Sequence, residues 1–169
     1  MQRVLILGCP GSGKSTLARE LAERTGLPLV HLDQLYWRPG WVEASKEEWR
    51  TRLAEVLVQP AWILDGNYGA TISMRLEAAD TAILLDLPTW LCLFRVFRRS
   101  VLGWGRIRSD MAEGCPERFD LQFIRYVLNF RRAKLPKVLT QLRVFRGQQV
   151  VLQTQAQMRQ FLQSFSQEA

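Results

Sequence analysis

The most informative residues of the sequence form a glycine-rich stretch that reads GCPGSGKST from position 8 to position 16. It completes the pattern G-x-x-x-x-G-K-[ST], in which glycines let successive backbone N–H groups turn toward a chain of phosphates. The lysine of the pattern, Lys14, adds a positive charge beside those phosphates, and the hydroxyl of Ser15 is a ligand for Mg²⁺. The pattern predicts a nucleotide-phosphate site formed by Gly8, Pro10, Gly11, Ser12, Gly13, Lys14, Ser15 and Thr16.

Aspartates that follow short apolar runs are the second group of residues that could do chemistry. Asp33, Asp65 and Asp86 each end a predicted strand, and side chains at the carboxyl ends of parallel strands reach the ligand crevice. A carboxylate there can hold Mg²⁺ or accept a proton from a hydroxyl group, and its other common role is to cap a turn. Asp86 stands two residues before Pro88, which favours the turn. The single histidine, His31, lies in a buried run and is expected to be structural.

Positive charge is concentrated in one segment of the chain. The formal net charge is +7, and residues 95–146 hold 13 of the 23 basic and 4 of the 16 acidic residues, a local balance of +9. Arg95 and Arg99 are four apart, so they share one face of a helix, and Arg106 and Arg108 follow in a loop. Such a segment indicates either a polyanionic partner or a solvated, arginine-rich helix.

The elements that must position these residues alternate along the chain. Strands are predicted at residues 3–7, 29–32, 61–64, 81–85 and 150–152. Helices are predicted after the glycine-rich stretch, after the capping residues Ser45 and Thr154, at residues 72–79 and after Pro88. The alternation predicts an α/β fold with a parallel sheet, helices on both of its faces and ligands at the carboxyl ends of its strands.

Between the fourth and fifth strands we expect two helices joined by an irregular loop. The first helix is predicted to turn Trp90, Leu93, Phe94, Phe97 and Val101 inward and to carry Arg95, Arg98 and Arg99 on its other face. Residues 103–116 have glycines, a proline and mixed charges without periodicity, which is typical of a mobile loop. The second helix is expected to run from residue 117 to residue 141 with a kink at Pro136.

Length and composition limit the remaining possibilities. A chain of 169 residues with 47% hydrophobic and 23% charged residues is expected to form a single domain, residues 1–169. No apolar run reaches the length of a membrane span, and the apolar run near the N-terminus is too short for an export signal, so a cytoplasmic location and no membrane partner are expected. Cys9, Cys92 and Cys115 lack metal-ligand spacing and are expected to be reduced thiols.

The chain resembles the adenylate kinase and shikimate kinase branch of P-loop proteins. More narrowly, it is similar to the adenylate-kinase-like group labelled DNA topology modulation proteins, through GCPGSGKST, HLDQLYWRPGW, WILDGNYG, LLDLP and the arginine-rich stretch up to CPERFD. The resemblance covers most of the chain. It implies a P-loop NTPase three-layer sandwich, with a five-stranded parallel sheet in the order 2-3-1-4-5 and an arginine-rich lid near residues 103–117.

The resemblance also implies roles for the candidate residues. Asp65, next to the glycine-rich stretch in that strand order, would hold Mg²⁺ through water, and Asp33 would accept the proton of the acceptor hydroxyl. The arginines that would close on the transferring phosphoryl group are Arg95, Arg99, Arg106 and Arg108. The sequence DGNYG stands where adenylate kinases have DGFPR, so the arginine that grips a nucleoside monophosphate is absent there. Arg75 is the candidate to replace it.

Two functions remain open at this point. One is Mg²⁺-assisted transfer of a phosphoryl group from ATP to a small-molecule or nucleotide acceptor, with Lys14, Asp33, Asp65 and Arg99 in catalytic roles. The other is a nucleotide-binding protein that associates with DNA through the basic segment. The kinase is favoured because a lid explains the same arginines and because no DNA-binding signature is present in the sequence.

Overall fold

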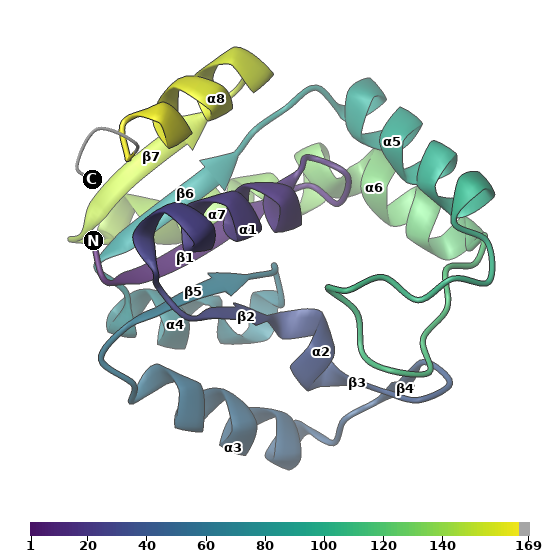
Figure 1. The fold of residues 1–169 in the computed structure, drawn as a ribbon, viewed down its shortest axis with the longest axis horizontal. Coiled ribbons are helices and arrows are strands. Elements are labelled where there is room, and N and C mark those ends of the chain that lie inside the picture. The colour runs from purple at the N-terminus through teal and green to yellow at the C-terminus, as the bar shows by residue number, and fades with distance from the viewer. Residues whose placement is uncertain (166–169) are drawn as a thin grey trace.

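The computed structural model describes residues 1–165, which form a five-stranded parallel sheet between layers of helices (Figure 1). The strands are β1 (Arg3–Gly8), β2 (Leu29–His31), β5 (Trp62–Asp65), β6 (Thr81–Leu85) and β7 (Gln148–Leu152). Their order in the sheet is β2-β5-β1-β6-β7. Counted along the chain among these five strands, it is the expected order 2-3-1-4-5, so the predicted fold class is confirmed. The intervening labels belong to a separate hairpin, β3 (Trp37–Arg38) with β4 (Val42–Glu43).

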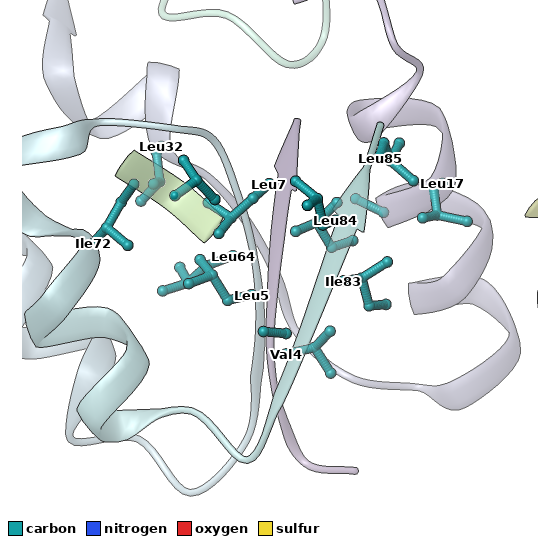
Figure 2. Packing of buried hydrophobic residues seen from close by; sticks show 14 of the residues in the cluster. Val4, Leu5, Leu7, Leu17, Leu32, Leu64, Ile72, Ile83, Leu84 and Leu85 are labelled. Carbon is teal, nitrogen blue, oxygen red and sulfur yellow. The ribbon is translucent and has the colours of Figure 1, made fainter. Parts of the chain in front are cut away.

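Helices cover both faces of the sheet because its central strands are apolar on both sides. Helix α1 (Lys14–Thr25) and helix α8 (Gln155–Gln163) lie on one face, and α4 (Ile72–Ala78) and α7 (Leu135–Val144) lie on the other. Figure 2 shows Leu85 of β6 beside Leu17 of α1, and Leu5 of β1 on the side of Ile72 of α4. All four side chains are buried, so the core fixes the sheet edge at which the candidate residues lie.

The predicted helix caps are confirmed. The Ser45 hydroxyl accepts a hydrogen bond from the Glu48 amide at 3.1 Å, at the start of α3 (Lys46–Leu57). Thr154 and Gln157 form a reciprocal capping box at the start of α8. The prediction that Asp33 ends a strand was wrong. The second strand stops at His31, and Asp33 lies in the first turn of the short helix α2 (Leu32–Tyr36).

The helix after β6, α5 (Thr89–Leu102), packs against the core with the face opposite to the predicted one. Trp90, Phe94, Phe97 and Val101 were expected inside and are exposed, and the fifth predicted residue, Leu93, is half-buried. The residues that α5 buries are Cys92, Val96 and Ser100. These side chains are small, so the backbone of α5 can approach the glycine-rich loop closely. A Cβ atom placed on Gly11 would lie 2.4 Å from the Cys92 carbonyl oxygen.

The long second helix was also predicted wrongly, because the segment forms two helices. Helix α6 (Leu121–Ala133) begins after Asp120, whose carboxylate accepts the Gln122 and Phe123 amides. Helix α7 begins at Leu135, with Pro136 in its first turn, where a proline costs no hydrogen bond. The chain therefore breaks at Lys134, before the proline. Within residues 1–165, no helix is both long and apolar enough to cross a bilayer.

Candidate active site

The glycine-rich loop between β1 and α1 adopts a backbone that non-glycine residues rarely accept. The φ angles are 148° at Gly8, 81° at Gly11 and 100° at Gly13. Within this loop Ser12 is fully buried, and its hydroxyl oxygen has no hydrogen-bond partner within residues 1–165. The Lys14 ammonium donates to the Cys9 carbonyl at 3.0 Å, so its charge lies over the loop. This is the geometry that binds phosphate groups.

Asp65 lies beside this loop, at the carboxyl end of β5, as predicted. Strand β5 pairs with β1, and Asp65 is buried. Its Oδ2 atom accepts a hydrogen bond from His31 Nδ1 at 2.9 Å, and its Oδ1 atom has no partner within the described chain. A buried carboxylate oxygen without a partner in the described chain, in a cavity that Ser15 also lines, matches the oxygen ligands that Mg²⁺ prefers. The residues present therefore fit a magnesium ion, with Ser15 and Asp65 as its candidate ligands.

A third carboxylate, which the sequence did not indicate, joins this cluster from the loop after α5. Asp110 is buried and lies close to the Ser15 hydroxyl. Burial alone would raise the pKa of Asp110, but the Arg108 guanidinium and the Ser15 hydroxyl together bring it below its usual value. Asp110 is therefore ionised near neutral pH. No sequence signal pointed to it, because the loop that carries it has no periodicity.

Asp33 forms a second carboxylate position in the same cavity. The Tyr68 hydroxyl donates a hydrogen bond of 2.5 Å to Asp33 Oδ1. Burial raises the pKa of Asp33 above its usual value, and the hydrogen bond from Tyr68 opposes this effect in part. A carboxylate with a raised pKa is a stronger base than one in water. Asp33 can thus accept a proton from a hydroxyl group held beside it.

Asn67 links the acceptor side of the site to the phosphate loop. Its Oδ1 atom accepts the Gly8 N–H at 3.1 Å, and its Nδ2 atom donates to the Gly8 carbonyl at 2.8 Å. The Tyr126 hydroxyl of α6 also lies close to the Asn67 side chain. The sequence DGNYG had been noted only for the arginine it lacks. A polar residue two positions after a strand-end aspartate was nevertheless a signal that could have identified Asn67.

The arginines of α5 and of the following loop reach the site unequally. Arg95 donates to the carbonyls of Gly11 and Ser12, both at 3.3 Å. Arg99 and Arg108 both pair with Glu117, with N···O distances of 3.1 and 2.6 Å.

The two pairs share one buried carboxylate oxygen, Oε1 of Glu117. Glu117 therefore holds two cations that line the cavity, a role that the sequence did not indicate. Arg106, the fourth candidate, is exposed and does not line the cavity.

The loop of residues 103–116 contains neither helix nor strand, as expected, and it packs against the hairpin β3–β4. Met111, Ala112 and Cys115 are buried against Trp37 and Trp41. Hydrogen bonds fix the same contact: the Trp41 indole donates to the Pro116 carbonyl at 3.1 Å, and the Gly40 amide donates to the Gly114 carbonyl at 2.9 Å. The loop thus covers the acceptor side of the site in this structure.

These groups surround one cavity of about 1180 Å³. The basic side chains that line it are Lys14, Arg19, Arg95, Arg99, Arg108 and Arg159. The carboxylates Asp33, Glu43, Asp110 and Asp120 and the aromatic side chains Trp37, Tyr68, Phe123 and Tyr126 also line it. The phosphate loop therefore contributes one wall of the cavity and Asp33 with Tyr68 contributes another, which is an arrangement suited to two different ligands.

Arg75, the candidate to replace the missing arginine, does not reach the cavity. It is fully buried under the loop after β5 and donates to the carbonyls of Gly66, Asn67 and Tyr68. The expectation that it substitutes for a phosphate-gripping arginine was wrong, because backbone oxygens occupy its donors. Asp86, for which a turn role was favoured, accepts from Gln153 and pairs with Arg131, both at 3.4 Å.

Comparison with known proteins agrees with this fold. Solved structures of similar fold include the shikimate kinase of Acinetobacter baumannii in complex with shikimate (TM-score 0.59, 20% identity, 99% of this chain and 92% of that chain). They also include the shikimate kinase of Bacteroides thetaiotaomicron (0.59, 14%, 98% and 96%) and a gluconokinase of Sinorhizobium meliloti 1021 (0.53, 14%, 99% and 98%). At these identities the likeness establishes the fold, an α/β P-loop kinase fold.

A search of curated proteins gave no match. Residues 4–102, from β1 to the end of α5, match the family described as AAA domain. Because the match covers more than half of the chain and includes the phosphate loop, Asp33 and Asp65, the chain belongs to this AAA domain family.

Proposed function

We propose that the protein is a kinase that transfers the γ-phosphoryl group of ATP to a hydroxyl group of a small molecule. The observation that supports this most directly is the single cavity in which the phosphate loop and Asp33 face each other. One wall suits the triphosphate of ATP, and the other offers a base to an acceptor hydroxyl. The shared fold of shikimate kinase and gluconokinase is in keeping with this reaction.

The proposed reaction assigns a step to each group. The acceptor oxygen attacks the γ-phosphorus, the bond between that phosphorus and the β,γ-bridging oxygen breaks, and ADP leaves. The proton of the acceptor hydroxyl passes to the Asp33 carboxylate. Lys14, Arg95 and Arg99 stabilise the negative charge on the phosphoryl oxygens. Mg²⁺, held by Ser15 and Asp65, would supply further neutralisation of the phosphate charge when it is bound.

The acceptor wall supports a substrate without an anionic group. Arg75 is committed to backbone carbonyls, and Arg108 is paired with Asp110 at 3.0 Å and with Glu117. Arg99, the other arginine near these groups, pairs with Glu117 and lies 5.9 Å from the centroid of the Phe123 ring, and the remaining side chains there are mainly carboxylates and aromatic rings. A neutral or cationic ring alcohol, such as a sugar, an amino sugar or a nucleoside, fits these groups better than a nucleoside monophosphate or a carboxylate.

The test is ADP release with Mg²⁺ and ATP against pairs of acceptors that differ in one anionic group. Suitable pairs are a nucleoside with its monophosphate and an aldose with its uronic acid. We expect turnover with the neutral or cationic member of a pair, and loss of that turnover in Lys14→Ala. Turnover with anionic members only would refute the acceptor class, and no turnover above background with any member would count against the kinase itself.

A second function is supported by the arginines that lie outside the cavity. Arg118, Arg125 and Arg132 are exposed, as the DNA-associated alternative requires, and the motif likeness to the DNA topology modulation group points the same way. We rank this function second, because Arg95, Arg99 and Arg108 are engaged at the cavity. Salt-dependent binding to duplex DNA that survives Lys14→Ala and is lost in Arg125→Ala with Arg132→Ala would raise its rank.

A further inference from the structure

The exposed face of α5 is a row of apolar side chains that the proposed reaction does not use. The exposed fractions are 70% for Trp90, 57% for Phe94, 52% for Phe97 and 54% for Val101. Trp104, just beyond the helix, is 66% exposed, and Phe119 lies in contact with Phe97 at 6.4 Å between ring centroids. We call these six residues the α5 strip. Contiguous apolar surfaces of this kind mark interaction sites.

The spacing of the strip is that of a helix-pairing seam. Positions 90, 94, 97, 101 and 104 follow one another at intervals of four, three, four and three residues. This is the spacing of the a and d positions in coiled coils, which lines side chains up along one side of a helix. A second helix laid along α5 would cover the four members of the seam that lie within the helix.

The area of the strip is close to what a stable dimer needs. Aromatic side chains present about 150–250 Å² each, so the exposed fractions of the six residues amount to roughly 650 Å² per chain. Standard protein interfaces bury about 800 Å² per partner, with a range of about 600–1,000 Å². The strip thus reaches this range before any rim residue is counted.

Charge distinguishes between the possible partners of the strip. Arg95 and Arg99 point from α5 toward the cavity, where they contact the phosphate loop and Glu117. Of the three arginines in α5, only Arg98 remains exposed. A nucleic acid or an anionic bilayer would find almost no cation within the strip itself, whereas an identical apolar strip is complementary to it. Two copies related by a two-fold axis would place Arg98 at the rim, in contact with water.

We propose that the protein forms a homodimer in which the α5 strips of two copies pack against each other. The interface lies on the face of α5 opposite to Arg95 and Arg99, so both cavities stay open to their ligands. The dimer also accounts for the orientation of α5, because the aromatic face that would otherwise contact water is covered by the partner. This proposal does not depend on the kinase activity.

Sedimentation velocity at micromolar protein concentration tests the proposal. We expect the wild-type chain to sediment at twice the 19.6 kDa of one copy, and Phe97→Glu to sediment as a monomer. The matched control is Val144→Glu, at an exposed apolar residue on α7 and outside the strip, which should remain a dimer. Circular dichroism of Phe97→Glu would verify that it folds. Turnover of the monomer within a few-fold of wild type would be consistent with cavities that do not need the interface.

Three results would overturn the proposal. A wild-type chain that is monomeric at all accessible concentrations excludes a stable dimer. A dimer that persists in Phe97→Glu places the interface elsewhere. Binding of the wild-type monomer to vesicles of phosphatidylglycerol, lost in Phe97→Glu and kept in Val144→Glu, would instead assign the strip to an anionic bilayer.

Discussion

The phosphate loop and helix α5 contact each other, yet they relate to their sequences in opposite ways. In the loop, the backbone itself forms the turn suited to phosphate groups, so that turn requires glycines at fixed positions, and these are visible in the sequence. In α5, side chains rather than the backbone line the cavity. The helix directs Arg95 and Arg99 inward, which leaves its aromatic face exposed. Hydrophobic periodicity predicts the orientation of a helix only where burial of apolar surface is its main task.

Gly11→Ala tests whether the backbone of the phosphate loop must keep its close contact with α5. The added Cβ would meet the Cys92 carbonyl at 2.4 Å, in a backbone with a φ of 81°. Because the loop would have to move away from α5, we expect ATP turnover to fall by about 10³-fold, the loss typical of misplaced preorganised donors. The control is Gly26→Ala, which has a φ of 69° and no atom within 4 Å, and which should keep its turnover. Equal losses in both variants would show that the contact with α5 is unimportant.

The α5 half is tested by removing the side chain that the helix turns inward. Arg99→Ala should lower kcat by about 10²-fold and leave ATP affinity within a few-fold, because the arginine acts on charge that develops in the transition state. Arg106→Ala is the matched control, since Arg106 is exposed and outside the cavity. A loss in Arg106→Ala as large as that in Arg99→Ala would contradict the assignment of Arg99 to the site.

The two faces of α5 can also be compared by their stability. Val96→Ala removes two buried methyl groups and should lower the free energy of unfolding by about 2 kcal/mol. Phe94→Ala, on the exposed face, should change it by less than about 0.5 kcal/mol. Both are measured by urea unfolding in the Phe97→Glu background, so that self-association does not contribute. A larger loss at Phe94 would mean that α5 packs with its other face inward.

The smallest effect concerns the acceptor side and is a shift in pH dependence. The acceptor proton passes to ionised Asp33, so kcat should rise with pH through the pKa of this carboxyl. Tyr68→Phe removes the hydrogen bond that lowers the pKa of Asp33, and the acid limb of the kcat profile should therefore move to higher pH. Tyr36→Phe removes a hydroxyl that lies close to Glu43, and it should leave the limb unchanged. An unmoved limb in Tyr68→Phe would exclude Asp33 as the titrating group.

Local signals in the sequence were sufficient for much of the fold and for half of the site. The strands, the caps at Ser45 and Thr154 and the glycine-rich loop depend on residues close together in the chain, and these predictions held. The break between α6 and α7 was misplaced, because a proline permits a helix start as well as a kink.

The contacts that were missed join residues far apart in the chain. Asp110 and Ser15 are 95 positions apart in the sequence, and Glu117 and Arg99 are 18 positions apart. The sequence around Arg75 does not show that three carbonyls of the turn after β5 accept hydrogen bonds from its guanidinium, so it was predicted to bind phosphate. Such contacts follow from the packing of the lid loop and of the turn after β5, which local propensity does not encode.

The double hydrogen bond between Asn67 and Gly8 has a thermodynamic consequence. Asn67 holds both the N–H and the carbonyl of Gly8, so the turn after β5 cannot shift without moving the first peptide of the phosphate loop. Occupancy of one wall of the cavity should thus change the dissociation constant at the other wall, by the same factor in both directions. In Asn67→Ala, the dissociation constant at each wall should no longer depend on whether the other wall is occupied.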